Sequence, residues 1–317
     1  MLKFDYKDYR NFVYGVVSVS FLKNKKSHSF VLWRESLILY WNDGEVRCFK
    51  NYCRHYGLPL DMGKLKGEEI ECGFHGWRYK LSNGELALAP LAKKQPKCNL
   101  FQYKAFVKGG IVFVYIGEPD YFEKATHSIL NNVLEKPASV WTVYETPFYW
   151  AMNSSMDFPH HSFHSFFYQL YGVYRALLQK GNPLKKTYTP VMLEETDFFF
   201  KFKISESDVE IEVRPFCTEY NDIQSKNKWQ MFIMPIDENS CRYLINIESN
   251  SKNVFFRWAT YFMFYTFIKY LAMPEDQNWL KNSNNHSEQK EHVLCDHDFG
   301  LRNYIRKFFV KPKSLEN

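Results

Sequence analysis

Short runs in which apolar and polar residues alternate, separated by turn residues, fill the first third of the chain. The predicted strands there are 14–21, 30–34, 37–40, 46–49, 103–108 and 111–116, with a further hairpin over 78–86. The turn Asn42-Asp43-Gly44 between two alternating runs is a strong hairpin signal, and Ser82-Asn83-Gly84 repeats it. Many short strands with turn glycines predict a small all-β domain, most simply an antiparallel barrel.

In the remainder of the chain the predicted helices and strands are longer. A connector with one helix is expected at 120–140, a strand-like stretch at 142–150, and mixed helical sequence at 166–178. Five long apolar runs then predict strands at 187–193, 198–204, 209–213, 228–234 and 241–248. Aromatic and amphipathic stretches at 253–273 and 292–313 predict helices. The pattern indicates an α+β protein with an all-β domain at 1–120 and a sheet-and-helix domain at 121–317.

Composition fits two domains with a large core. The chain has 317 residues, of which 45% are hydrophobic and 19% aromatic, enough to enclose an apolar pocket. The net charge of +6 is modest and scattered, so nucleic-acid binding has little support. A weakly basic surface suits docking of an acidic electron-transfer protein instead.

The cysteine usage and the chain start indicate a cytoplasmic protein. Two of the seven cysteines belong to the motif described next, and the other five are scattered and odd in number, which predicts a reducing compartment. The first residues lack the charged start and apolar run of a signal peptide. The stretch 253–273 nearly has the length of a bilayer span, but Arg257 and Lys269 interrupt it. We expect a buried or amphipathic helix there, without membrane contact.

The candidate chemistry centres on the stretch from Cys53 to His75. Cys53-Arg54-His55 is followed after sixteen residues by Cys72-Gly73-Phe74-His75, so each half offers one thiolate and one imidazole. A [2Fe-2S] cluster held by two Cys on one iron and two His on the other needs this ligand set. A zinc ion could also take two Cys and two His, although zinc sites usually pair like ligands.

These two loops resemble those of the Rieske iron-sulfur proteins, in the form found in Rieske non-heme iron oxygenases. The second loop is usually Cys-Pro-Tyr-His-Gly-Trp in that family, and here it is Cys72-Gly73-Phe74-His75-Gly76-Trp77. The first loop usually continues Cys-x-His-Arg, whereas Tyr56 follows His55. Both departures leave the four ligands in place. The resemblance implies a Rieske domain followed by a helix-grip catalytic domain, in which a curved sheet and helices enclose the substrate pocket.

A second candidate metal site lies at 153–164. On a helix, Asp157, His160, His161 and His164 fall at separations that place their side chains on one face. Two imidazoles one turn apart and a carboxylate from elsewhere form the 2-His-1-carboxylate triad of mononuclear Fe(II) oxygenases.

The family pattern implies which of these residues hold the iron. The pattern resembles Asn-x3-Asp-x2-His-x4-His, which Asn153, Asp157 and His160 match in order. The last ligand would fall on Ser165, and we take its neighbour His164 as the ligand; a pairing of His161 with His164 stays open. In the family a late helix supplies the carboxylate, and Asp276 stands where we would place it.

Glu275 is the competitor of Asp276 for that role. An acidic residue at a helix start is commonly there for the helix dipole alone.

The resemblance also implies a function. Rieske oxygenases use the cluster and the mononuclear Fe(II) to activate O₂ and oxidise an organic substrate, by hydroxylation, oxidative demethylation, dihydroxylation or desaturation. The chain has no nucleotide-binding Gly-x-Gly-x-x-Gly of its own, so an external reductase or ferredoxin would supply electrons. The short single subunit looks similar to the vanillate-demethylase and pheophorbide-oxygenase-like group, which favours monooxygenation of a hydrophobic substrate.

The resemblance further implies a homotrimer, in which Asp157 matches the carboxylate that links the cluster of one subunit to the iron of the next. The alternative function is a non-catalytic iron-sulfur electron carrier whose second domain has lost its iron.

Overall fold

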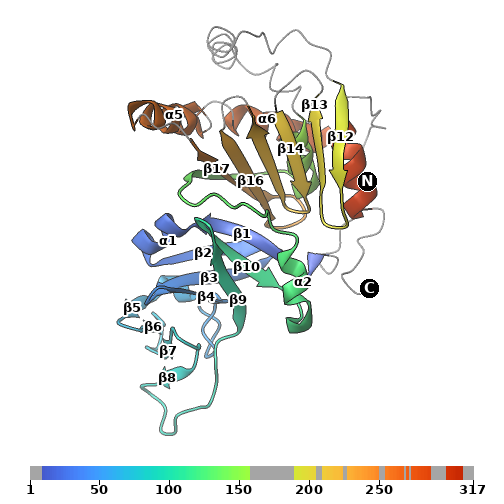
Figure 1. Ribbon diagram of the computed structural model, residues 1–317. Helices are drawn as coiled ribbons and strands as arrows, with labels where there is room; N and C mark the ends of the chain where they lie inside the picture. Colours follow the sequence, from blue (N-terminus) through green and yellow to red (C-terminus); the bar gives the residue numbers. More distant parts are fainter. Residues whose placement is uncertain are drawn as a thin grey trace.

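The computed structural model describes residues 9–157, 189–204, 209–223, 227–249, 254–267, 269–270, 273–286 and 298–309. They form two lobes, one above the other in Figure 1. The lower lobe contains the strands up to β10, and the upper lobe contains a large sheet with helices around it. The predicted α+β class is confirmed.

The lower lobe consists of two antiparallel sheets. The larger has the order β1-β10-β9-β4-β3-β2, and the smaller has the order β5-β6-β7-β8. Their bounds are Phe12–Ser18 (β1), Ser27–Leu32 (β2), Glu35–Asn42 (β3), Glu45–Lys50 (β4), Lys64–Lys66 (β5), Glu69–Glu71 (β6), Arg78–Lys80 (β7), Leu86–Leu88 (β8), Gln102–Lys108 (β9) and Ile111–Ile116 (β10). The predicted hairpin turns are confirmed: Asp43 and Gly44 both have positive φ, at 47° and 84°, as a tight two-residue turn requires.

One predicted strand of this lobe is too long. The run 14–21 leaves the sheet at Ser18, and helix α1 (Val19–Lys25) begins there. The Ser18 side chain accepts a hydrogen bond from the Phe21 backbone N–H, which caps the helix and ends the strand.

The upper lobe is built on one seven-stranded antiparallel sheet with the order β11-β17-β16-β15-β14-β13-β12. The strands are Ala138–Tyr144 (β11), Pro190–Glu195 (β12), Phe200–Ile204 (β13), Val209–Arg214 (β14), Cys217–Asp222 (β15), Lys228–Pro235 (β16) and Cys241–Glu248 (β17). The sequence pattern missed β15 entirely. It also wrongly extended a strand over 142–150, because the chain turns at Pro147 and continues as a helix.

Helices cover one face of this sheet. They are α3 (Phe148–Met156), α5 (Val254–Phe267), α6 (Met273–His286) and α7 (Phe299–Tyr304), the last continued by the π-helical turn η8 (Ile305–Phe309). The largest hydrophobic cluster includes Met152 and Met156 of α3 and Tyr243 of the sheet, and it continues into the lower lobe through residues such as Tyr14 and Leu37. Within the described ranges, no helix is long and apolar enough to cross a bilayer.

The opposite face of the large sheet packs on the lower lobe. Phe113 of β10 meets Phe232 of β16 edge to face, with ring centroids 5.5 Å apart. Strand β1 comes equally close, because a Cβ at Gly15 would lie 2.7 Å from the Phe232 ring. The two lobes therefore share a second apolar core, and glycine at position 15 is needed for their approach.

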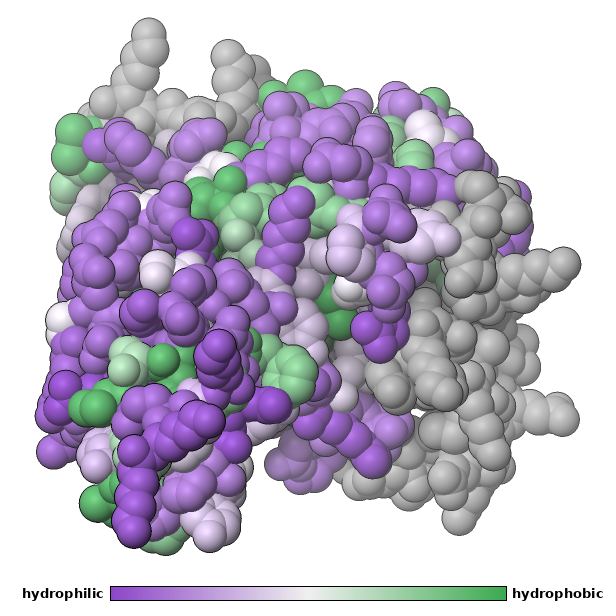
Figure 2. Space-filling view, turned by 90° about the horizontal axis from the view of Figure 1, so that it is seen from below, coloured by the Kyte–Doolittle hydropathy of each residue, from purple (hydrophilic) through white to green (hydrophobic). Residues whose placement is uncertain are grey.

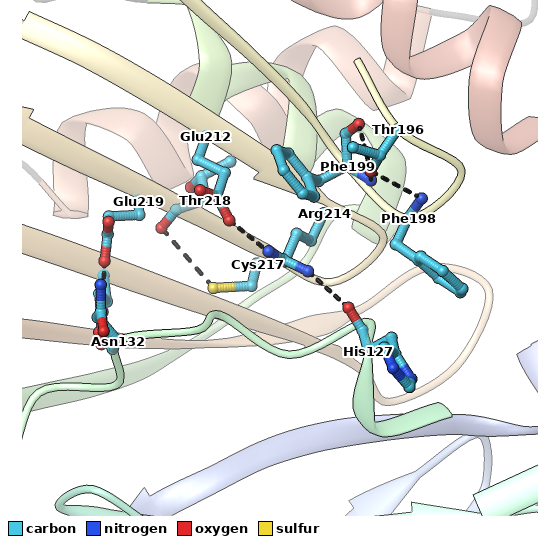
Figure 3. Close-up of polar contacts among 11 residues, drawn as sticks. His127, Asn132, Thr196, Phe198, Phe199, Glu212, Arg214, Cys217, Thr218 and Glu219 are labelled. Atoms are coloured by element: carbon cyan, nitrogen blue, oxygen red, sulfur yellow. Dashed lines mark hydrogen bonds and ion pairs between the residues drawn. The ribbon is translucent and has the colours of Figure 1, made fainter. Parts of the chain in front are cut away.

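Buried polar side chains attach the connector between the lobes to this face of the sheet. The connector contains the short 3₁₀ turn η3 (Pro119–Tyr121) and helix α2 (Phe122–Thr126). The Arg214 guanidinium, 1% exposed as a residue, donates to the His127 carbonyl at 2.6 Å and to Glu212 at 2.7 Å, and it lies over the Phe199 ring (Figure 3). A buried arginine needs hydrogen-bond acceptors. One of the two acceptors of Arg214 is a backbone carbonyl of the connector.

Gln230 makes a second attachment. Its amide nitrogen donates to the Asn132 carbonyl at 2.7 Å and to the Glu219 carboxylate at 2.6 Å, and its amide oxygen accepts from the Leu134 N–H at 3.1 Å. Burial raises the pKa of Glu219. The connector is thus held by hydrogen bonds at two points along one side of the sheet.

The turn between β2 and β3 also contacts the upper lobe. Trp33 and Arg34 both have positive φ, 48° and 64°, which is unfavourable for residues with side chains. Their backbone N–H groups donate to the carbonyls of Pro235 (3.2 Å) and Ile236 (2.7 Å) in the upper lobe. Docking on the upper lobe therefore compensates the unfavourable turn conformation.

A half-buried histidine between the lobes predicts a pH dependence of stability. Arg242 of β17 donates to His28 Nε2 of β2 at 2.8 Å, so this imidazole accepts and is neutral. Burial and, second, the positive charge of Arg242 lower the pKa of His28 from 6.5 to about 4. The unfolded chain takes up this proton below about pH 6.5 and the folded chain only near pH 4, so up to roughly 3 kcal/mol of stability should be lost between these values.

Urea unfolding at a series of pH values measures this loss. The His28→Gln variant keeps an acceptor for Arg242 but has no proton to take up, so its stability should fall less over the same interval. Parallel pH profiles for the two proteins would assign the acid sensitivity to other groups.

Candidate functional site

The first cysteine–histidine loop is a closed turn. The Cys53 N–H donates to the Leu58 carbonyl at 2.8 Å, and the Cys53 carbonyl accepts from the Gly57 N–H at 2.9 Å. Gly57 has φ +76°, which favours glycine. The loop is held from below by Asn51, whose side-chain oxygen accepts from the Leu60 N–H at 2.9 Å.

The second loop repeats this arrangement. The Cys72 N–H donates to the Trp77 carbonyl at 2.8 Å, and the Cys72 carbonyl accepts from the Gly76 N–H at 3.1 Å. Gly76 has φ +67°. The strands on either side approach closely, because a Cβ at Gly63 would lie 2.2 Å from the Glu71 carbonyl oxygen. Two turns of the same hydrogen-bonded form therefore face each other across a narrow gap.

The four predicted ligands converge at this gap. Cys53, His55, Cys72 and His75 line one pocket, together with Tyr56, Leu58, Phe74 and Trp77. The two cysteines are 2% and 3% exposed, whereas His55 is exposed and His75 half-buried. The imidazole rings lie 4.8 Å apart between centroids. Two inner thiols and two outer imidazoles are the donor set and order that a Rieske cluster needs.

Neighbouring aromatic side chains orient these ligands. The His55 ring stacks on Trp77 at 4.6 Å with an angle of 5° between the planes. The buried Tyr79 of β7 places its hydroxyl 3.2 Å from Cys53 Sγ, and the same oxygen accepts from the Arg54 N–H at 3.0 Å. Burial and the hydrogen bond to Cys53 raise the pKa of Tyr79, so the phenol keeps its proton and donates it to sulfur.

The sequence analysis did not identify Tyr79. The residue follows the second loop by two positions on a strand, but only the folded chain brings it to the first loop.

The Tyr79 hydroxyl should raise the reduction potential of the site. Hydrogen bonds to cluster sulfurs favour the reduced, more negative state. Loss of one hydrogen bond of about 1 kcal/mol corresponds to a fall of about 40 mV for a one-electron couple. We expect Tyr79→Phe to shift the midpoint by this amount in a spectroelectrochemical titration while the cluster remains bound. The Tyr40→Phe variant, another buried tyrosine of the lobe, should leave the midpoint unchanged.

Helix α3 carries the first residues of the second candidate site. Asn153 lies in its last turn, and Asp157 ends the helix, with its N–H donating to the Asn153 carbonyl at 3.0 Å. Both side chains are half-buried. Two buried tyrosines hold the helix on the sheet: Tyr243 donates to the Ala151 carbonyl and Tyr220 to the Ser155 carbonyl. His160, His161, His164 and Ser165 lie outside the described residues.

The late carboxylate lies on the same side of the sheet. Asp276 is in the first turn of α6, which contacts α3, and both Asp276 and Glu275 are half-buried. Burial raises the pKa of Tyr144 and Tyr243, and the negative charge of Asp276 adds to both shifts. These two rings lie 4.5 Å apart between centroids on neighbouring strands. Asp276 therefore lies close enough to Tyr144 and Tyr243 for its charge to act on both.

Outside the two cysteine–histidine loops, no three described His, Cys, Asp or Glu side chains lie close enough together to hold one metal ion. The described part of the second candidate site consists of Asn153, Asp157 and Asp276.

Comparison with known proteins places the first lobe in a family. A family model described as the Rieske [2Fe-2S] domain matches residues 12–104. The oxygenase component of 3-ketosteroid-9-alpha-monooxygenase from Mycolicibacterium smegmatis is 35% identical over 92 residues, 28% of this chain and 24% of the relative. Chlorophyllide a oxygenase from Arabidopsis thaliana is 27% identical over 115 residues, 34% of this chain and 20% of the relative. The matches thus span about a quarter of the length of these relatives.

Solved structures resemble the chain over nearly its whole length. The terminal oxygenase of carbazole 1,9a-dioxygenase from Novosphingobium sp. KA1 has a TM-score of 0.71 at 17% identity, covering 94% of this chain and 91% of that one. The corresponding enzyme from Nocardioides aromaticivorans IC177 has a TM-score of 0.72 at 14% identity, covering 93% and 92%. At such identities the likeness establishes the fold, a first all-β lobe followed by a sheet with helices.

Proposed function

We propose that this chain, whose residues 12–104 belong to the Rieske [2Fe-2S] domain family and whose fold is that of Rieske terminal oxygenases, is an oxygenase subunit. It would use a [2Fe-2S] cluster and a mononuclear Fe(II) to oxidise a hydrophobic organic substrate with O₂. The observation that carries the proposal is the presence of both candidate centres in one chain of this fold. The family match also favours a cluster over the zinc alternative.

The cluster would be held by Cys53 and Cys72 on the inner iron and by His55 and His75 on the outer iron. The bound cluster supplies single electrons at a potential raised by its neutral histidine ligands. Trp77 fixes the His55 ring, and the Tyr79 hydroxyl donates to Cys53 Sγ, so both ligand types have supporting contacts.

The mononuclear site would be held by His160, His164 and Asp276. The bound Fe(II) supplies open coordination positions for O₂. His161 and Glu275 remain the alternatives to His160 and Asp276. The charge of Asp276 acts on Tyr243, whose hydroxyl donates to the Ala151 carbonyl of α3, and this proximity to α3 supports Asp276.

The outer end of the first lobe would receive the electron donor. Its exposed apolar side chains include Tyr56 (73%), Met62 (68%) and Phe74 (62%), all beside the ligand loops. The exposed cations Arg54, Lys64 and Lys66 accompany them, and Figure 2 shows this end of the molecule as a mainly hydrophilic surface with small hydrophobic groups. Asp61 and Glu68 are exposed in the same stretch and Lys66 pairs with Glu71, so the charges there are mixed, and the apolar side chains would make the main contact with a ferredoxin or a reductase. Structures similar to this chain include complexes of an oxygenase with a ferredoxin.

We also propose a cytoplasmic homotrimer in which Asp157 links neighbouring subunits and Asn153 supports it through the last turn of α3. Six cysteines lie in the part of the chain that the structure describes, and none of them forms a disulfide, which fits a reducing compartment. The names of the relatives include monooxygenases and a dioxygenase, and we favour monooxygenation for this chain.

Asp157→Asn tests the proposed function. The variant keeps the shape of the side chain but loses its charge, so the cluster spectrum and the bound iron should remain. The rate at which O₂ reoxidises the reduced protein should fall by about 10–100-fold, as is usual for a residue that supports metal ligands. Visible absorption of the cluster follows this rate in a stopped-flow instrument.

A matched control is Glu145→Gln, an exposed carboxylate paired with Lys281; it should react at the normal rate. The carrier alternative predicts something different: iron equal to the sulfide content in the purified protein, and no effect of Asp157→Asn.

A further inference from the structure

Helix α5 has an apolar face that the rest of the described chain leaves open. Its exposed apolar residues are Val254 (68%), Phe255 (69%), Trp258 (60%), Phe262 (54%) and Tyr265 (42%). At 100° per residue these five positions fall within one side of the helix. At the edge of this face, Tyr261 packs against the main core and accepts from the Ser249 N–H. In Figure 1 the helix lies at the edge of the upper lobe, beside β17.

The aromatic side chains of this face are arranged as a continuous surface. Trp258 stacks on Phe262 with centroids 5.5 Å apart and an angle of 14°, and Phe255 lies 6.4 Å from Trp258. An apolar surface of this extent on an outer element is typical of an interaction site.

The charged residues of the segment 249–274, which contains α5, are all positive. Arg257 and Lys269 are exposed, and Lys269 donates to the Tyr265 hydroxyl at 2.7 Å. Between Glu248 and Glu275 the sequence contains no acidic residue at all. A partner that covers this face must therefore be apolar beneath the aromatic stripe and anionic beside it.

A lipid surface meets both conditions. Trp and Tyr side chains prefer the boundary between hydrocarbon and water, and Lys and Arg bind anionic headgroups. A helix of 14 residues is about 21 Å long, too short for a hydrocarbon core of about 30 Å, but it suits a helix lying in the plane of the interface. A twofold contact of α5 with α5 of a second copy would bring Arg257 and Lys269 close to like charges.

We propose that α5 docks the protein on an anionic membrane surface, with the Trp258–Phe262 stripe inserted between headgroups and Arg257 and Lys269 on the phosphates. The sequence predicted no membrane contact, because Arg257 and Lys269 interrupt the apolar stretch, and the exposure of this face became visible only in the folded chain. The proposal is independent of the oxygenase function, since it concerns a surface that neither candidate centre uses.

Flotation with lipid vesicles tests it. The purified full-length protein should float with vesicles of phosphatidylcholine containing one-third phosphatidylglycerol and bind pure phosphatidylcholine vesicles less. Replacing two aromatic anchors together, Trp258→Ser with Phe262→Ser, should reduce the partition coefficient by about a hundredfold or more. Arg257→Gln with Lys269→Gln should reduce binding to the anionic vesicles by about thirtyfold and binding to neutral vesicles little.

A matched control replaces exposed apolar residues elsewhere, Leu91→Ser with Leu193→Ser (79% and 42% exposed), and should bind as the unmodified protein does. Equal flotation of the Trp258/Phe262 variant and the control would overturn the proposal. So would absence of binding to anionic vesicles together with a loss of self-association in that variant, measured by light scattering, because the face would then join copies of the chain.

Discussion

Replacing Cys72 with Ser should eliminate the iron-sulfur cluster and with it all electron transfer. Cys72 is buried at the inner end of the ligand pocket, so water cannot take its place as a ligand. A serine hydroxyl ionises far less readily than a thiol and is a poor ligand for iron in such clusters. We expect acid-labile sulfide and the visible absorption of the cluster to disappear, iron to fall by two atoms per chain, and O₂-dependent turnover to become undetectable.

Cys98→Ser is the matched control for that variant. Cys98 packs against the same hydrophobic cluster of the first lobe, but it lies outside both ligand loops. The variant should keep sulfide, absorption and activity. A Cys72→Ser protein that retained the cluster spectrum would show that another residue ligates the inner iron.

The elements that sequence predicted well are those whose signals are local. The Asn42-Asp43-Gly44 turn needs only residues that tolerate positive φ, and the structure has the hairpin there. The cysteine–histidine loops are equally local, because each is closed by hydrogen bonds within six residues. Such features carry their structural reason in the residues themselves.

The features that sequence missed depend on distant parts of the chain. The stretch 142–150 has the apolar aromatic composition of a strand, but Pro147 and the packing of α3 against the large sheet make its second half helical. The hydroxyls of Tyr220 and Tyr243, which hold α3, come from strands more than sixty residues away. No periodicity of the sequence indicates these contacts, since they arise only when the sheet forms.

The sequence also could not predict which helix side chains are exposed. The apolar residues of α5 and those of α3 are similar in composition, yet Met152 is fully buried and Trp258 is 60% exposed. The spacing of apolar residues predicts that a helix has an apolar face. The elements packed around the helix determine whether this face is buried in the core or exposed. The difference between a core helix and a docking helix is therefore a property of the tertiary structure.

Replacing Asp276 with Ala should remove the mononuclear iron while the cluster remains. Asp276 lies in the first turn of α6, and its charge acts on Tyr144 and Tyr243 of the sheet. Residues that only support metal ligands already change affinity by 10–100-fold, so loss of a direct ligand should lower iron affinity by more than about 100-fold. Iron analysis should show the loss of one atom per chain at unchanged sulfide, and the reduced cluster should no longer be reoxidised by substrate-coupled turnover.

Glu275→Ala is the matched control, because Glu275 is the adjacent carboxylate, half-buried in the same first turn. Successive residues on a helix point about 100° apart, so only one of the two side chains can face the tyrosine pair. We expect the Glu275 variant to keep its iron and to lose at most about 1 kcal/mol of stability, from the missing charge at the helix N-terminus. If iron were lost from the Glu275 variant and kept in the Asp276 variant, the carboxylate ligand would be Glu275, and the charge of Asp276 beside the tyrosines would serve the packing of α6 alone.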